Sequence, residues 1–409
     1  MGQKATAENR PKGVYQGISR LLLYCRLMLN NPYGIDKDGR LVVSSWQQVL
    51  QTVVSLLICA LLLFLAYFGW GRFSLQNPYI TLKVLRNLVH AVFWLTYMIE
   101  SKRQNGSMTR IFERIKTIED RVAPQEKQLR KFSRKVWSWI LVSFGLCAGF
   151  TALRLCHVGR DLVEILCAVT DIILIGSPLL WDMPLWMLLT LCVYYIDYVN
   201  SELGKTFTEQ AFVVSSVSAL GPPETDKLDK TRRLSSLRDL FRKIDDLKNE
   251  VNDLFANRIW ICVLSAFIEI VHFFFFNITL IRYWSVASGS ISLSGFTLFN
   301  FWKVVNALRL FEVVIVCSRL AEKGQSTSIV VHELFAETVD DQAKNELAIF
   351  SLELLHIDVG VSGNGFFTVD YSLLSAVASA AVMYTIVLFQ FEFPGYSEDI
   401  RPVEDMYDF

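Results

Sequence analysis

The stretch that decides the fold is the last long apolar run, FFTVDYSLLSAVASAAVMYTIVLFQFEF, from Phe366 to Phe393. Between Asp370 and Glu392 it holds no charged residue. At about 1.5 Å of rise per residue, a helix over this run is long enough to cross the ~30 Å hydrocarbon core of a bilayer. Its first half is rich in serine and alanine, which let membrane helices pack closely, and one amide, Gln390, lies near its far end. A polar side chain in such a helix usually faces protein or water, so the run is a candidate pore-lining helix.

The composition of the whole chain also favours a membrane protein. Of the 409 residues, 52% are hydrophobic, and 40 basic and 40 acidic residues cancel to a net charge of zero. This balance gives no indication of a nucleic-acid partner. The apolar residues come in long runs, and most of the eight cysteines lie inside those runs, where cysteine behaves as a small hydrophobe. We therefore expect an all-α integral membrane protein without a disulfide framework.

Seven spans are expected in all. The six runs before the last one cover residues 46–70, 78–99, 136–156, 162–198, 258–283 and 296–317. The fourth run is longer than one crossing needs, and Pro178 and Pro184 are expected to bend it or mark its ends. Ahead of the fifth run, apolar residues recur every three or four positions from Leu234 to Leu254, which predicts a long helix with one apolar stripe.

The basic residues orient these spans. Segments 1–45, 100–135, 201–258 and 319–360 hold nearly all lysines and arginines outside the spans. Positive charge concentrates on the cytoplasmic side, so the N-terminus is predicted inside and, after seven crossings, the C-terminus outside. We divide the chain into a cytoplasmic N-terminal segment (1–45), six spans with cytoplasmic helical loops forming a ligand-binding bundle (46–320), a cytoplasmic helical anchor (321–365), the pore-lining seventh span (366–393) and an acidic extracellular tail (394–409).

Two other classes of seven-helix or multi-helix membrane protein fit less well. A G-protein-coupled receptor has its N-terminus outside, and its usual Asp/Glu-Arg-Tyr and Asn-Pro-x-x-Tyr motifs are absent from the expected places. A transporter is expected to show an internal repeat or paired broken helices, and only the prolines of the fourth run point that way.

The seventh span resembles the signature of insect gustatory receptors. Its segment Met383-Tyr384-Thr385-Ile386-Val387-Leu388-Phe389-Gln390-Phe391 is similar to the family pattern of Thr-Tyr, five mostly hydrophobic residues and Gln-Phe. The preceding Gly365-Phe366-Phe367-Thr368-Val369-Asp370 resembles the family's glycine-aromatic-aromatic-Thr-x-Asp lead-in. Met383 departs from the pattern, so the role of the family's threonine is not carried over to it.

The resemblance implies a tetrameric, ligand-gated, non-selective cation channel of the plasma membrane, placed in the dendrite of a sensory neuron. Each subunit would contribute its seventh helix to a central pore, and the cytoplasmic helices would form the main contact between copies of this chain or related subunits. The implied partners are a small-molecule tastant and membrane lipid. No nucleic acid is implied.

Five residues near the outer end of the seventh span are expected at the pore or gate. Gln390 is costly in an apolar helix unless it meets water or its symmetry mates, and neighbouring apolar rings can close a pore by dewetting. A ring of Glu392 would favour cations. The alternatives are an interhelical hydrogen bond and a solvated acidic terminus. The expected pore or gate residues are Gln390, Phe391, Ile386, Phe389 and Glu392.

The resemblance also implies a ligand pocket among the outer halves of the second to sixth spans. Polar and charged residues there are expensive, about 2.5–3.5 kcal/mol each at mid-membrane on insertion scales, and aromatic faces stack on sugar rings or alkaloids. The alternative for each charged residue is a structural salt bridge, for example Asp171 or Glu269 with Lys303 or Arg86. The candidates are Arg86, Asn87, His90, Trp94, Asp171, Glu269, His272, Phe273, Trp302, Lys303 and Asn306.

Motifs for catalysis or cofactor binding are missing from the sequence. It contains no glycine-rich phosphate loop, nucleophile elbow or CxxC, and His332-Glu333 lacks the second histidine of a zinc-protease helix. We expect no enzyme activity, no catalytic residue, no cofactor and no metal.

Overall fold

The computed structural model describes residues 33–35, 41–70, 78–103, 105–122, 183–206, 224–282 and 293–392, with scattered positions between 134 and 152. These parts are mostly helical, with one antiparallel strand pair, β1 (Tyr33–Ile35) and β2 (Leu41–Val43), and a non-helical connection over 357–370. The all-α class is therefore confirmed, with this small hairpin as the exception. The named helices are α2 (Ser45–Trp70), α3 (Pro78–Arg103), α4 (Asn105–Glu119), α7 (Glu224–Arg282), α9 (Leu293–Glu337), α10 (Asp341–His356) and α11 (Tyr371–Glu392), and residues 183–206 form a further helix.

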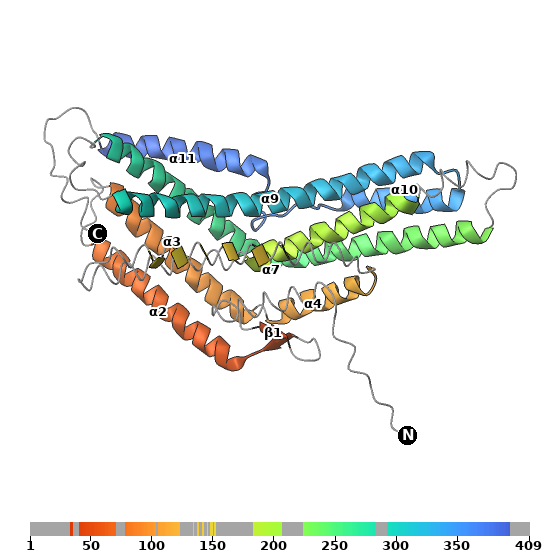
Figure 1. Ribbon diagram of the computed structural model, residues 1–409, viewed down its shortest axis with the longest axis horizontal. Helices are drawn as coiled ribbons and strands as arrows, with labels where there is room; N and C mark the ends of the chain where they lie inside the picture. The colour runs from red at the N-terminus through yellow and green to blue at the C-terminus, as the bar shows by residue number, and fades with distance from the viewer. Residues whose placement is uncertain are drawn as a thin grey trace, which may run out of the picture.

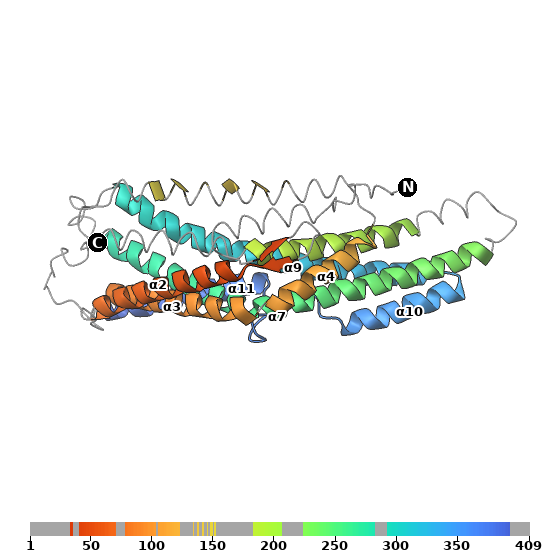
Figure 2. The ribbon, with the colours of Figure 1, turned by 90° about the horizontal axis from the view of Figure 1, so that it is seen from below.

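The helices are arranged along one long axis. Figure 1 shows α2, α3 and α11 beside the end of α7 and the start of α9 in one half. The other half holds α4, α10, the helix over 183–206 and the beginning of α7, and the view in Figure 2 agrees with this division. α7 joins the two halves as one continuous helix of 59 residues, about 90 Å at 1.5 Å per residue. The long helix predicted ahead of the fifth run therefore continues without a break into that run.

Three helices of the described part are long and apolar enough to cross a membrane: stretches Ser45–Phe64 in α2, Leu228–Ile281 in α7 and Tyr371–Phe391 in α11. A shorter apolar stretch in α3 runs from Val84 to Thr96. The apolar stretch of α9 is interrupted by Lys303, Arg309 and Glu312. Of the remaining expected spans, most of 136–156 and all of 162–182 lie outside the described residues.

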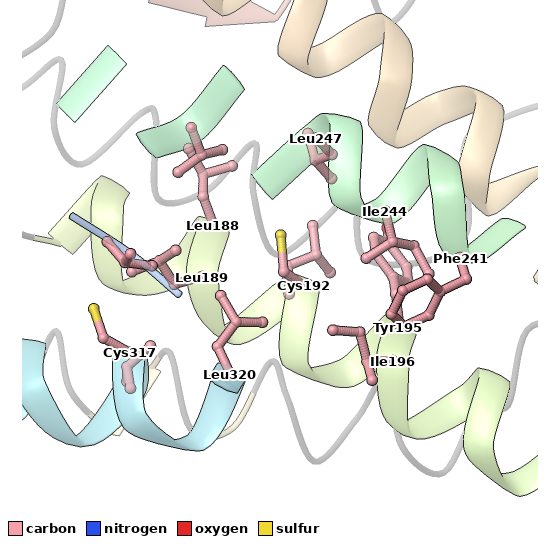
Figure 3. Close-up of a cluster of buried hydrophobic side chains, with 14 of the residues drawn as sticks. Leu188, Leu189, Cys192, Tyr195, Ile196, Phe241, Ile244, Leu247, Cys317 and Leu320 are labelled. Carbon is pink, nitrogen blue, oxygen red and sulfur yellow. The ribbon is translucent and has the colours of Figure 1, made fainter. Parts of the chain in front are cut away.

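The apolar stripe predicted on α7 is confirmed. Figure 3 shows Phe241, Ile244 and Leu247 facing side chains from the helix over 183–206, with Leu320 of α9 nearby. Leu247 is fully buried, as is Tyr195 of the opposing helix. The apolar residues 183–198, which we assigned to the end of the fourth run, thus pack against α7 and α9. Their hydrophobicity serves a core of protein side chains.

Ion pairs line the surface around this core. Arg110 of α4 contacts Glu250 of α7 at 2.7 Å, and Arg238 of α7 contacts Glu346 of α10 at 2.9 Å. α9 continues through residue 320 to Glu337, so the boundary that we drew there falls inside one helix. The half with α4 and α10 is therefore built on extensions of the same helices that form the apolar half.

Candidate functional site

A cluster of buried polar side chains lies where α3, α7 and α9 meet. Lys303 of α9 forms an ion pair with Glu269 of α7, and both side chains are only 1% exposed. The Lys303 ammonium also lies 3.0 Å from Nδ1 of His272. His90 of α3 places its Nε2 3.7 Å from the other carboxylate oxygen of Glu269. The cluster therefore connects three helices through one carboxylate and one ammonium.

Helical spacing explains why these residues meet. Glu269 and His272 are three residues apart on α7 and share one face, as do Asn87 and His90 on α3. All four are buried, at 3% exposure or less. The faces converge on Lys303, which α9 contributes from an otherwise apolar stretch. The polar pair on α3, the polar pair on α7 and Lys303 on α9 are far apart in the sequence, and the fold brings them together into one site.

The cluster contains hydrogen-bonding capacity that it does not use. Among the described residues, the buried Oδ1 of Asn87 accepts no hydrogen bond. A buried polar atom left in this state costs about 1–3 kcal/mol. A ligand that carries hydroxyl or amino groups would recover this cost and could exchange partners with Glu269, Lys303 and the two histidines. The arrangement is chemically suited to binding a polar molecule, and it lacks the grouped ligands of a metal site in the part of the chain that the structure describes.

The other predicted ligand-binding residues are placed differently. Trp94 is buried in a separate apolar cluster with Ile58 and Cys59 of α2 and Ile261 of α7. Arg86 is half-buried on α3, close enough to act electrostatically on His90 and Glu269. Phe273 is half-buried beside Phe274, with ring centroids 5.5 Å apart.

Three further predictions fall outside what the structure describes. Asp171 lies outside the described residues. Trp302 and Asn306 lie on α9, but the positions of their side chains are outside the description. Of the predicted set, the structure brings His90, Glu269, His272 and Lys303 together in one cluster, and the suggested pairing of Glu269 with Lys303 is confirmed.

Two contacts between α7 and α9 were missed from the sequence. Arg309 is 5% exposed and donates to the sulfur of Cys262 at 3.1 Å. Nearer the end of α7, Asn277 donates to Asn300 at 2.8 Å. Arg309 and Asn277 stand out in the sequence as polar residues within apolar runs. Spacing within one helix, however, gives no indication of a partner on another helix.

The seventh span buries only one side. Val377, Ala381 and Thr385, spaced four apart, are 8%, 0% and 3% exposed. The predicted pore residues lie mostly off this side: Ile386 is 53% exposed, Phe391 is 68% exposed and Gln390 is exposed.

The remaining residues of the α11 signature complete this picture. Phe389 is half-buried, and Met383, which departs from the family pattern, is 57% exposed. Glu392 is the last residue of α11, and its side chain is outside the description. Most of the α11 face that carries the signature residues is therefore not covered by other described residues of the single chain.

Comparison with solved structures identifies the fold. The chain matches the insect olfactory receptor OR5 of Machilis hrabei, solved in complex with eugenol, with a TM-score of 0.63 and 16% sequence identity over 92% of this chain and 98% of that one. A second structure of the same receptor also matches, with a TM-score of 0.63 at 15% sequence identity. The two chains share the same overall fold.

Sequence comparison gives local matches to gustatory receptors. The chain is 27% identical over 95 residues to the protein named gustatory receptor 28b of Drosophila melanogaster, and 32% identical over 82 residues to the one named gustatory receptor 28a. These matches cover 20% and 18% of the two relatives. The gustatory and pheromone receptor 33a of the same fly is 26% identical over 102 residues, 22% of its length.

A family model covers far more of the chain. The model described as 7tm Chemosensory receptor matches residues 18–393, which include the buried cluster, α7 and the whole of α11. It describes a family of receptors and not of enzymes. Together with the gustatory relatives and the olfactory-receptor fold, this match confirms the resemblance that the seventh span indicated: the chain belongs to the 7tm chemosensory receptor family of insects.

Proposed function

We propose that this chain is a gustatory receptor subunit, a tastant-gated, non-selective cation channel in which four copies surround a central pore lined by α11. The observation that carries the proposal is the one-sided burial of α11. An apolar helix that leaves Gln390 and Phe391 exposed beside Ile386 needs a further partner for that face, and symmetry-related copies around a pore provide one.

Seven crossings with a cytoplasmic N-terminus are part of this proposal. The positive charge of segments 100–135, 201–258 and 319–360 supports it, because these segments lie on one predicted side. The long helices α7 and α9 agree with it, since each has an apolar part and a polar extension. We assign the extensions, with α4 and α10, to the cytoplasm and the chain to the plasma membrane of a sensory neuron.

An apolar row on α10 supports assembly through the cytoplasmic half. Ile349, Leu352 and Leu355 are 36%, 60% and 72% exposed. Their spacing of three places them on one side of the helix, where the single chain leaves them uncovered. Copies of this chain, or related subunits, are the proposed occupants of this side.

The tastant is proposed to bind at the cluster of His90, Glu269, His272 and Lys303. A polar molecule would compete for the Glu269–Lys303 pair, and differential contacts of this kind are what allow a ligand to shift a conformational equilibrium. Both sugars and alkaloids carry the required groups. Asn87 supplies an additional buried acceptor.

Expression of this chain alone in cells without other chemoreceptors tests the proposal. We expect a cation current in response to at least one compound from a panel of sucrose, fructose, trehalose, caffeine and quinine, with no requirement for G proteins. Neutralising Glu392 should reduce cation permeability. Currents abolished by G-protein inhibition, or compound uptake without current, would favour a G-protein-coupled receptor or a transporter instead. An epitope tag found outside the cell at the N-terminus would contradict the proposed orientation.

A further inference from the structure

The connection between α10 and α11 is a small, ordered hairpin. The Val369 N–H donates to the Val361 carbonyl at 2.8 Å, and the Gly363 N–H donates to the Phe367 carbonyl at 3.0 Å. At its tip, Asn364 and Gly365 have φ of 53° and 73°. Positive φ at both central positions with the sequence Asn-Gly is the signature of a type I′ turn. We name residues 361–369 the pre-pore hairpin, and it contains most of the glycine-aromatic-aromatic-Thr-x-Asp motif.

One face of α7 holds this hairpin and the residues just before it. Lys248, 3% exposed, donates to the Asp358 carbonyl and forms an ion pair with Asp245 at 3.1 Å. One turn further along α7, Oδ1 of Asn252 accepts the Ser362 N–H at 2.8 Å. The contacts to Asp358 and Ser362 satisfy backbone groups of the connection. They therefore restrict movement of the connection along α7.

A further side-chain contact reaches the tip of the hairpin. Asn257 of α7 accepts a hydrogen bond from the side-chain amide of Asn364. Lys248, Asn252 and Asn257 therefore contact the connection at three points along about two and a half turns of α7.

Close packing fixes the hairpin from other directions. A Cβ at Gly324 of α9 would lie 2.4 Å from a methyl carbon of Val359, so the two segments approach as closely as glycine permits. A Cβ at Gly363 would lie 2.6 Å from the Phe367 ring. Val361 and Val369 are 1% and 3% exposed. The hairpin is thus held in a defined position against α7 and α9.

No flexible linker separates the hairpin from α11. Asp370 follows Val369 directly. Its carboxylate accepts hydrogen bonds from the N–H groups of Ser372 at 2.8 Å and Leu373 at 3.3 Å, as an N-cap residue does. α11 begins at Tyr371. A displacement of the hairpin therefore moves the start of α11 with it.

From this geometry we propose that Asn252 and Asn257 are positioning residues for gating: they couple movement of α7 to α11 through the pre-pore hairpin. The inference rests on the proposed channel function. α7 carries Glu269 and His272 farther along the same uninterrupted helix. A second contact between the helices, the rings of Phe267 and Tyr384 with centroids 5.7 Å apart, lies between these two regions. A ligand that shifts α7 would move both contacts, and the hairpin transmits the shift to the base of the pore helix.

The test compares three variants of α7 with the unmodified full-length chain. Asn252→Ala removes the acceptor, Asn252→Asp keeps an acceptor oxygen, and Asn249→Ala removes an amide that bonds Asp245 on the exposed side of the same helix at 3.1 Å. Single-channel recording uses the compound from the sucrose, fructose, trehalose, caffeine and quinine panel that evokes the largest current. We expect Asn252→Ala to reduce the ratio of open to closed channels by about threefold to tenfold, the effect of one hydrogen bond.

Single-channel conductance should stay unchanged in Asn252→Ala, because the pore itself is intact. Asn252→Asp should restore most of the opening, and Asn249→Ala should gate as the unmodified chain does. Normal gating of Asn252→Ala would overturn the inference, as would equal losses in Asn252→Ala and Asn249→Ala.

A second variant covers the case in which Asn252→Ala fails to reach the cell surface by biotinylation. Asn364→Gly removes the amide that contacts Asn257 but preserves the positive φ, and it is expected to reduce opening at unchanged conductance. Normal gating of Asn364→Gly would then overturn the inference. An unmodified chain that reaches the surface and conducts under no condition would contradict the proposed channel function, and the gating role with it, whereas failure in the variants alone leaves the channel function standing.

Discussion

Lys303 of α9 and Glu269 of α7 form an ion pair in which each side chain is 1% exposed. Burial of two opposite charges is costly, and their attraction offsets this cost only when the surrounding groups complete the hydrogen bonding. His272 at 3.0 Å from Lys303 and His90 at 3.7 Å from Glu269 supply such groups. The pair is therefore the centre of a network that fixes α3, α7 and α9 relative to one another.

Removal of one partner from this pair should destabilise the protein strongly. Glu269→Gln or Lys303→Met alone leaves an uncompensated buried charge, and we expect a loss of about 3–5 kcal/mol. The double variant Glu269→Gln/Lys303→Met should recover much of that loss. Thermal unfolding in detergent measures both effects.

The matched control is the pair of Arg242 and Glu353, which are 60% and 23% exposed at 3.0 Å. Replacement of Arg242 by Met should cost no more than about 1 kcal/mol, as for other surface pairs. A Lys303→Met variant as stable as Arg242→Met would contradict the importance given to the buried network.

Much of this arrangement could be predicted from the sequence because it depends on local patterns. The seventh span follows from length and lack of charge, and the stripe of α7 follows from apolar spacing, since Phe241, Ile244 and Leu247 recur at helical intervals. The charges in apolar runs marked Glu269 and Lys303, because a lone charge there needs a partner.

Contacts between distant helices were harder to predict. Trp94 shares a buried cluster with Cys59 of α2, and Arg309 contacts Cys262, yet each sequence position is compatible with several helix faces and partners. The pairing depends on helix rotation and crossing, which tertiary packing decides. Asn364-Gly365 indicates a turn, but this signal alone does not predict the pre-pore hairpin, because it lacks the long alternating strands that usually flank it.

The stability of the half that holds α4 and α10 should depend on pH through Glu119. This carboxyl at the end of α4 is largely buried, and burial, with a smaller contribution from neighbouring Asp120, raises its pKa from 4.5 to about 7. The folded state therefore binds its proton more tightly than the unfolded state. The stabilisation is fully present below pH 4.5, declines as pH rises and is lost above pH 7.

The variant Glu119→Gln tests this dependence. It should remove the decline and raise the unfolding temperature at pH 8 relative to the unmodified protein, with a gain of at most about 3 kcal/mol. Thermal unfolding at pH 5.5 and 8 provides the comparison, and Glu113→Gln, an exposed position on the same helix, serves as the control. An unchanged pH profile in Glu119→Gln would assign the dependence to another group.

Gln390 should affect conduction and not folding. Its side chain is exposed near the end of α11, so replacement by Ala removes no contact from the core of the single chain. If it faces the pore, Gln390→Ala should change single-channel conductance or open probability at least severalfold. Thr385→Ala is the contrasting variant: Thr385 is 3% exposed and donates to the Ala381 carbonyl at 2.7 Å, so its loss should affect stability first. Normal conductance and gating in Gln390→Ala would exclude it from the gate.

Asp370 should stabilise the start of α11 through its carboxylate. It accepts two backbone N–H groups and the Ser372 hydroxyl, and the hydrogen bonds from Ser372 lower its pKa. A lowered pKa means that the stabilisation is present above the unfolded value of 3.8 and is lost as pH falls through the folded value. Because the group is largely exposed, the expected effect is that of an N-cap, about 0.5–2 kcal/mol for Asp370→Ala. Asp370→Asn retains an acceptor oxygen and should lose only a few tenths of that, at about 0.3 kcal/mol. Unfolding temperatures of the two variants at pH 7 distinguish the N-cap from a general charge effect. Equal losses of stability in the two variants would mean that the charge of Asp370, and not the hydrogen bonds it accepts, stabilises the start of the helix.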